Sequence, residues 1–155
     1  MRRVLGGLLV VALSLAAVAG LVLVLQSRDD AEVGSPGGPG EKVDARCPDS
    51  PAGVTRDARR LNQDQIRQAT SLGNVVIRYP GTRPPAALVE LQDELTGPFD
   101  AEIAAAGQAV ILAAGGQSFE GLAWGRRLRV GTAGDPQLRT FAEAWLGDGA
   151  PEPCG

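Results

Sequence analysis

The sequence predicts an α+β protein in three parts: a transmembrane helix over residues 1–25, a flexible linker over 26–46, and a small mixed β-sheet domain covered by helices over 47–155. Three observations predict this organisation. The chain begins with a long apolar run, continues with closely spaced glycines and prolines, and then alternates between strand-like and helix-like patterns.

The apolar run Val4–Leu25 is long enough to cross a bilayer. At the helical rise of about 1.5 Å per residue it reaches roughly 33 Å, against roughly 30 Å of hydrocarbon. Arg2 and Arg3 precede the run and should stay in the cytoplasm. We therefore expect a single-pass protein of the cell membrane with an extracytoplasmic domain. The alternative is a cleaved secretory signal, since Ala17-Val18-Ala19 form a small-x-small site, and it would export the same domain.

The exported part is acidic, which argues against a nucleic-acid partner. Two of the 15 basic residues lie in the first 25 positions, which leaves 13 against 18 acidic residues and a formal charge of −5. Nucleic-acid binding needs a concentrated Lys/Arg surface. Residues 26–46 are rich in Gly, Pro, Ser and charge, a composition that cannot bury enough apolar surface to fold and so predicts a flexible linker.

The two cysteines stand at the two ends of the predicted domain, Cys47 at its entry and Cys154 one residue from the chain end. In an oxidising compartment an isolated pair is most simply a disulfide. Two free buried thiols and an intermolecular bridge are the alternatives. Without a C-x-x-C motif, a redox-active pair is not expected.

The domain opens with a helical pattern and continues into a βαβ unit. Residues 55–72 read as one broken helix, interrupted by the polar run 62–65. The β-branched run 74–79 predicts a strand. A helix follows, opened by Pro84 and Pro85 and ended by Gly97.

The second half of the domain predicts more strands and a last helix. Residues 99–106 should form a short helix or a turn, and the continuous apolar run 109–114 a central strand covered on both faces. Residues 126–130 alternate basic and apolar side chains, which suits an edge strand. Asp135 and Pro136 are a good helix start for a helix that runs to Gly147.

The chain contains no histidine, which removes the Ser-His-Asp and Cys-His arrangements and the commonest metal ligand. We therefore predict no catalytic residue, no metal ligand and no cofactor. A group of carboxylates could be imagined as an acid/base or Ca²⁺ site, although a solvated helix face explains them more simply. These carboxylates are Glu90, Asp93, Glu94, Asp100 and Glu102.

A candidate binding surface is formed by Trp124, Arg126, Arg127 and Arg129. Arginines around a tryptophan can form a basic ledge for an anionic headgroup or an acidic partner. An edge strand protected by charge is the simpler explanation. The expected partners are the membrane, through the N-terminal helix, and a protein of the cell envelope, while the oligomeric state stays open.

Several motifs resemble a bacterial family named domain of unknown function thirty-one hundred and five. They are Ala123-Trp124-Gly125-Arg126-Arg127-Leu128, Asp135-Pro136-x-Leu138 with Phe141, Ala150-Pro151-Glu152-Pro153 with the terminal cysteine, and the strand Asn74–Tyr79. The resemblance covers about Ala69 to Gly155. It implies one membrane helix, a low-complexity linker and an extracytoplasmic domain, and it implies no activity.

The chain departs from this family where the family carries histidines. The family motif His-Ser-Leu-Glu-His-Gly is here Thr70-Ser71-Leu72-Gly73-Asn74, and the upstream Pro-Pro and Gly-Pro-His segment is missing between Cys47 and Ala69. Any metal binding by those histidines would be lost. The sequence thus favours a membrane-tethered binding or scaffolding module. The alternative is a carboxylate-based hydrolase or metal-dependent enzyme that uses the carboxylates between Glu90 and Glu102.

Overall fold

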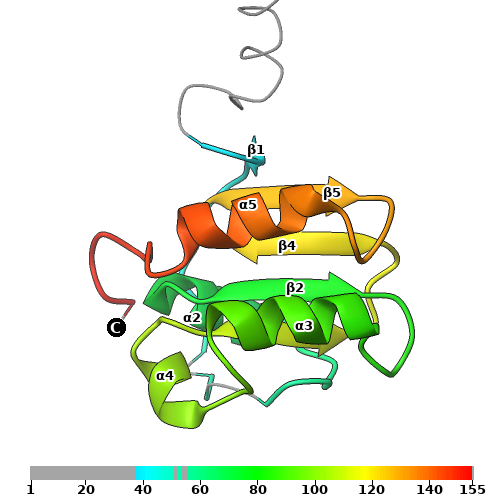
Figure 1. Ribbon diagram of the computed structural model, residues 1–155. Coiled ribbons are helices and arrows are strands. Elements are labelled where there is room, and N and C mark those ends of the chain that lie inside the picture. The colour runs from blue at the N-terminus through cyan, green and yellow to red at the C-terminus, as the bar shows by residue number, and fades with distance from the viewer. Residues whose placement is uncertain (1–37, 51, 54–55, 155) are drawn as a thin grey trace, which may run out of the picture. The chain divides into compact units, whose positions relative to one another are not determined.

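A computed structural model describes residues 38–50, 52–53 and 56–154, which form a small α+β domain (Figure 1). The predicted membrane helix and residues 26–37 of the predicted linker lie outside these residues. Within the described part of the chain, no helix is both long and apolar enough to span a bilayer.

The sheet is mixed and has five strands in the order β1-β5-β4-β2-β3. β2 and β3 run parallel, and the other neighbouring pairs are antiparallel. The strands are β1 (Glu41–Lys42), β2 (Val75–Tyr79), β3 (Val110–Ala114), β4 (Phe119–Ala123) and β5 (Arg126–Val130). The helices are α2 (Gln63–Leu72), α3 (Ala86–Leu95), α4 (Ala101–Ala105) and α5 (Pro136–Trp145). The predicted βαβ unit is confirmed as β2, α3 and β3, with α4 in the same crossover.

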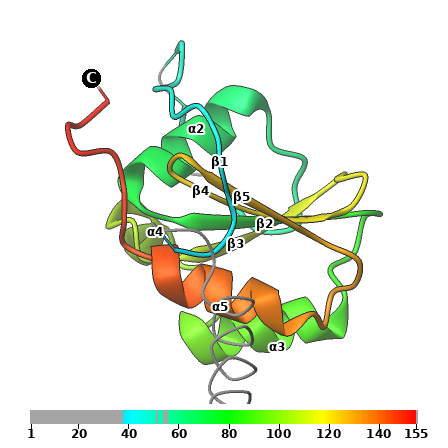
Figure 2. The ribbon, with the colours of Figure 1, turned by 90° about the horizontal axis from the view of Figure 1, so that it is seen from above.

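Helices cover both faces of the sheet, but unequally. α3 and α5 lie side by side on one face, and α2 lies on the other (Figure 2). Successive side chains of a strand point to opposite faces, so Val75, Ile77 and Tyr79 enter the core under α3 and α5. Val76 packs instead with Ala69 of α2 in a second, smaller core.

The predicted helix starting at Asp135 is confirmed as α5. The Asp135 side chain accepts a hydrogen bond from the Gln137 backbone N–H at 3.0 Å, and Pro136 occupies the first turn. The prediction of one broken helix over 55–72 is wrong, because α2 begins only at Gln63. The Asn62 and Gln65 side chains each accept a hydrogen bond from the other residue's backbone N–H, at 2.8 and 2.9 Å. The polar run that suggested an interruption is therefore the capping box that starts the helix.

The apolar run 109–114 forms β3, which is the last strand of the sheet and not a central one. Its outer edge is covered by residues 57–59. The Leu112 backbone N–H donates to Asp57 Oδ1 at 2.9 Å, and the Ala58 N–H donates to the Leu112 carbonyl at 2.7 Å. Because this segment shields the edge and helices shield both faces, the strand is as buried as a central one.

β4 was not predicted as a strand because Glu120 and Gly121 interrupt its apolar pattern. The structure explains the glycine: a Cβ atom at Gly121 would lie 2.8 Å from Cδ1 of Phe141 in α5. The glutamate is explained by its ion pairs, described below. Both residues are adapted to tertiary contacts that a local pattern does not contain.

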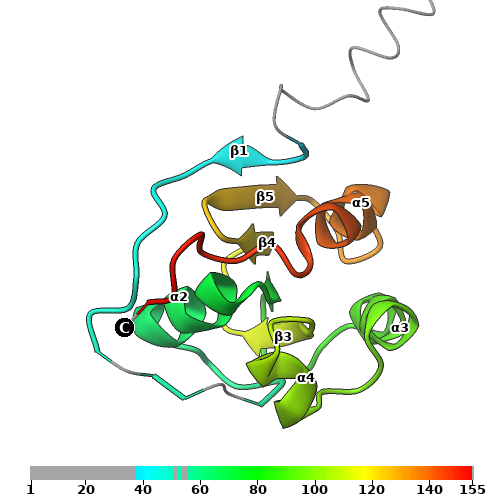
Figure 3. The same cartoon turned by 90° about the vertical axis from the view of Figure 1, so that its left-hand side faces the viewer.

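Residues 38–46, which the sequence assigns to the linker, lie against the domain. β1 pairs with β5, as Figure 3 shows, and Trp145 Nε1 donates to the Pro39 carbonyl at 2.8 Å. Gly38 and Gly40 have φ near +90° and approach the rings of Trp145 and Phe141 too closely for a side chain. Two glycines typical of a flexible linker are thus used here for close packing.

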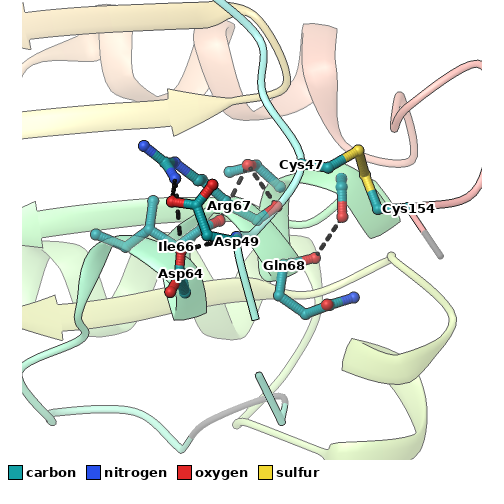
Figure 4. The surroundings of a disulfide bond; sticks show 9 residues. Cys47, Asp49, Asp64, Ile66, Arg67, Gln68 and Cys154 are labelled. Atoms are coloured by element: carbon teal, nitrogen blue, oxygen red, sulfur yellow. Dashed lines mark hydrogen bonds and ion pairs between the residues drawn. A yellow bond between two sulfur atoms is a disulfide. The ribbon is translucent and has the colours of Figure 1, made fainter. Parts of the chain in front are cut away.

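The disulfide between Cys47 and Cys154 is present, with 5.5 Å between the Cα atoms and 107 residues of sequence separation. It joins the segment after β1 to the C-terminal tail, beside α2 (Figure 4). The same tail is held by the Ala150 backbone N–H, which donates to the Ser71 carbonyl at 2.8 Å. Both ends of the domain are therefore fixed at the C-terminal end of α2.

Removing this crosslink should destabilise the domain strongly. In the chain-entropy model, closing a loop of about 100 residues contributes roughly 4 to 5 kcal/mol to the free energy of unfolding. We expect the double variant Cys47→Ser/Cys154→Ser to lose about that amount in urea unfolding. The wild type in reductant should unfold at the same urea midpoint as the variant. Equal midpoints for the oxidised and reduced wild type would contradict the prediction.

Asp57 should give the domain a characteristic pH dependence. Its carboxylate accepts hydrogen bonds from Gln92 Nε2 at 2.6 Å and the Leu112 N–H at 2.9 Å, but burial raises its pKa above the ordinary value of 3.8. The folded state therefore binds this proton more tightly than the unfolded chain. Its contribution to stability is present below pH 3.8 and is lost as the pH rises through the folded pKa.

The variant Asp57→Asn lacks this titration. The free energy of unfolding of the wild type, relative to the variant, should fall as the pH rises from about 3.8 and then level off. Urea unfolding between pH 3 and 7 measures this difference, and the ¹³Cγ shift of Asp57 reports its pKa directly. If the free energy of unfolding of the wild type, relative to the variant, rises with pH, the prediction is wrong. The hydrogen bonds to Asp57 would then lower its pKa more than burial raises it.

Candidate binding cleft

One half of the α2 face of the sheet is open. Val76 of β2 and Ile111 and Ala113 of β3 make one part of this face apolar, and they pack against α2 and α4. In Figure 3, α2 lies at the height of β2 and β3, and β5 lies above it, where the helix does not cover the sheet. A cleft of about 370 Å³ lies there, between β4, β5 and α2, and residues 43–46 form its rim.

The floor of the cleft is a row of three charged side chains across three strands. Arg78 of β2 lies opposite Glu120 of β4, which lies opposite Arg129 of β5. Arg78 Nη1 is 3.2 Å from Glu120 Oε2, and Arg129 Nε is 2.7 Å from Glu120 Oε1. Glu120 is only 8% exposed, so each oxygen of a buried carboxylate has its own arginine. The bond to Glu120 also raises the pKa of Arg129 above its ordinary value.

Arg127 and Trp124 extend this floor. Arg127 lies two residues before Arg129, on the same face of β5, and its Nε is 2.6 Å from Glu41 Oε1 in β1. Trp124 lies in the turn between β4 and β5 and lines the same cleft, half-buried. Three of the four residues of the predicted surface thus gather in one concave site.

Arg126, the fourth residue of the predicted surface, directs its charge elsewhere. It borders the cleft, but its guanidinium carbon lies 4.6 Å from the centroid of the Trp145 ring. Residues of a strand alternate between faces, so Arg126 shares the face of Leu128, which packs against the α3 and α5 core. Its cation–π contact holds α5 against β5.

The rim of the cleft is held by charged residues close to the disulfide. Arg67 of α2 is 2.7 Å from Asp49 and 3.5 Å from Asp64 (Figure 4). Asp49 lies two residues after Cys47, so the crosslink also fixes the segment that carries this partner. The rim and the floor therefore belong to one structure fixed by ion pairs and a covalent bond.

Sequence reasoning missed Arg78, Glu120 and Arg67. The alternation in β2 does place Arg78 on the face opposite Val75, Ile77 and Tyr79, and this signal could have marked it. Glu120 could not be found without knowing that β4 is a strand between β2 and β5. Arg67 is one of several polar residues of α2, and only the fold shows that it borders a cleft.

The carboxylates that the alternative hypothesis, an enzyme, would use are not gathered into one site. Glu90 and Glu94 border a groove of about 190 Å³ between α3 and α5, where Glu94 pairs with Arg139. Asp135, also in this groove, caps α5. Asp100 caps α4, where its Oδ1 accepts from the Glu102 N–H at 2.7 Å. Among the residues that the structure describes, no group of three or more Asp, Glu, Cys or His side chains is placed to hold a metal ion.

Comparison with protein-family models, with curated proteins and with solved structures finds no match for this chain. The resemblance to the family of unknown function stays a prediction from the motifs.

Replacing Glu120 should destabilise the domain. The change Glu120→Gln leaves two arginines without their buried counter-charge and puts an amide N–H group against guanidinium donors. Breaking a buried pair costs roughly 3–5 kcal/mol, and partial exposure of Arg129 should reduce this to about 1–3 kcal/mol. Urea unfolding measures the loss.

The matched control is Glu94→Gln. This glutamate also pairs with an arginine, but its side chain is 60% exposed. Exposed pairs contribute at most about 1 kcal/mol, so we expect a change below that value. Equal losses in the two variants would show that Glu120 is not a buried structural carboxylate.

Proposed function

We propose that this protein is a membrane-tethered extracytoplasmic binding module that takes its ligand in the cleft between β4, β5 and α2. The observation that carries the proposal is the gathering of Trp124, Arg127 and Arg129 on the lining of one concave site. Ligand sites are typically concave, with a few polar groups placed among apolar ones. This cleft has that mixture, since Leu122 and Ile66 lie among the arginines.

The location is proposed from the sequence and supported by the disulfide. The apolar run Val4–Leu25 is long enough to anchor the chain, and Arg2 and Arg3 favour a cytoplasmic N-terminus. A crosslink between Cys47 and Cys154 suits an oxidising compartment outside the cytoplasm. The anchor would keep the protein in the membrane, among the proteins of the envelope.

No observation favours the enzyme alternative. Glu94 pairs with Arg139 and Asp100 caps α4, so both are engaged in structural contacts. The groove that Glu90 and Glu94 border is about half as large as the cleft. The charged groups that line the cleft are guanidiniums and two carboxylates, Asp44 and Glu120, each of which pairs with an arginine. This set of groups suits recognition better than proton transfer.

The chain contains one lysine, Lys42, which makes the proposal testable in intact cells. Lys42 is exposed in β1 and immediately precedes Val43 of the cleft rim. A membrane-impermeant, amine-reactive cross-linker added outside the cells should label the full chain at Lys42 and join it to a protein bound in the cleft. The variant Lys42→Arg should lose both products.

The double variant Arg127→Gln/Arg129→Gln should still be labelled but should form much less of the adduct. Arg139→Gln, on the opposite face, is the matched control and should form the wild-type amount. Absence of labelling at Lys42 would contradict the proposed location. An adduct of unchanged yield in the double variant would contradict binding in the cleft.

A further inference from the structure

The arginines of the cleft floor retain hydrogen-bonding capacity that the protein does not use. Within the described residues, the structure records a protein acceptor for only one nitrogen of each guanidinium: Nη1 of Arg78 and Nε of both Arg127 and Arg129. Arg78 therefore keeps its Nε/Nη2 pair, and Arg127 and Arg129 each keep their Nη1/Nη2 pair. Each of these is a fork of two parallel N–H donors.

The forks lie close to one another. Arg78 and Arg129 bind the two oxygens of one carboxylate, which places their guanidiniums on either side of Glu120. Arg127 is two residues from Arg129 on the same face of β5, about 7 Å along the strand. The donors are also held in place, because Glu120 binds one nitrogen of Arg78 and one of Arg129, and Glu41 binds one nitrogen of Arg127.

An anion with two neighbouring oxygens is the natural partner of such a fork. Guanidinium groups bind carboxylates and phosphates through two parallel N–H···O bonds, which are stronger than bonds between neutral groups. The three guanidiniums of the floor pair with two carboxylates, Glu120 and Glu41, so one positive charge remains for a ligand. Trp124, Leu122 and Ile66 offer apolar surface beside it.

We infer that the cleft binds a small organic oxyanion, with its carboxylate or phosphate group on the forks of Arg127 and Arg129 and its organic part against Trp124. This inference rests on the proposed function and names its ligand class. The volume of about 370 Å³ suits a small molecule or one terminal group of a larger one.

Fluorine NMR of the full chain in lipid nanodiscs tests the inference. The chain has two tryptophans, and 5-fluorotryptophan gives one signal for each. Trp124 lines the cleft, whereas Trp145 packs, half-buried, against the core of the other face and is an internal control. The variant Trp124→Phe assigns the signals. The probes are benzoate, phenyl phosphate and benzamide, which is the neutral analogue of benzoate.

Benzoate or phenyl phosphate should shift the Trp124 signal saturably and leave the Trp145 signal in place, and benzamide should do neither. Comparing the two anions distinguishes a carboxylate site from a phosphate site. Arg127→Gln/Arg129→Gln should weaken binding by about tenfold or more, as loss of charge-assisted bonds predicts. Arg139→Gln should not change it. Arg127→Gln alone keeps the Glu120 row intact and should weaken binding without altering the Trp145 signal.

The inference is overturned if neither anion shifts Trp124 saturably, if benzamide binds equally well, or if the arginine variants bind like the wild type. Should the Lys42 adduct still depend on Arg127 and Arg129 in that case, the binding module stands and only its ligand class is wrong. If the anions do not bind and the Lys42 adduct does not depend on the arginines either, the proposed function is overturned as well.

Discussion

The unequal helical cover of the two sheet faces is the constraint on which this domain depends. α3 and α5 together cover one face, and α2 with the short α4 covers β2, β3 and Leu122 of β4 on the other. The open half cannot be apolar without exposing a large hydrophobic patch to water. Glu120, Arg127 and Arg129 occupy it instead, and their ion pairs connect β2, β4, β5 and β1 where no helix packs.

Residues 38–50 and 56–59 have a second organising role, because they reach both outer edges of the sheet. Glu41 pairs with Arg127 at the β5 edge, and Asp57 and Ala58 bond to Leu112 at the β3 edge. Unpaired strand edges invite association with other chains, and covering them is a common protection. The disulfide at Cys47 fixes this segment between its two edge contacts. Protection of the sheet and shaping of the cleft thus use the same stretch of chain.

Local patterns predicted those parts of the fold that local interactions determine. α5 has its cap at Asp135 and an apolar stripe through Leu138 and Phe141, and both signals lie within a dozen residues. β4 was not predicted as a strand, because two of its residues suit contacts that are distant in sequence. Gly121 accommodates Phe141, which is 20 residues away, and Glu120 is stabilised by arginines of two other strands. Three residues of the candidate site were found because they are close in sequence.

The residues that complete the site were missed for the same physical reason. Arg78 and Glu120 are 42 positions apart and meet only through the pairing of β2 with β4. The position of β3 at the edge was also unpredictable, since residues 57–59 make it as buried as a central strand. In each case the surroundings of a residue are set by a segment distant in sequence, which the pattern of its neighbours along the chain cannot reveal.

The same ion pairs that stabilise the open face prepare it for recognition. A free arginine loses side-chain entropy when it binds a ligand, which lowers affinity. Here Arg78 and Arg129 are already held by Glu120, and Arg127 by Glu41, so part of that cost is met on folding. The buried carboxylate also lowers the positive charge of the floor and so disfavours indiscriminate binding of polyanions. A site built in this way selects for ligand geometry, because the forks of fixed guanidiniums accept only an anion whose oxygens match them.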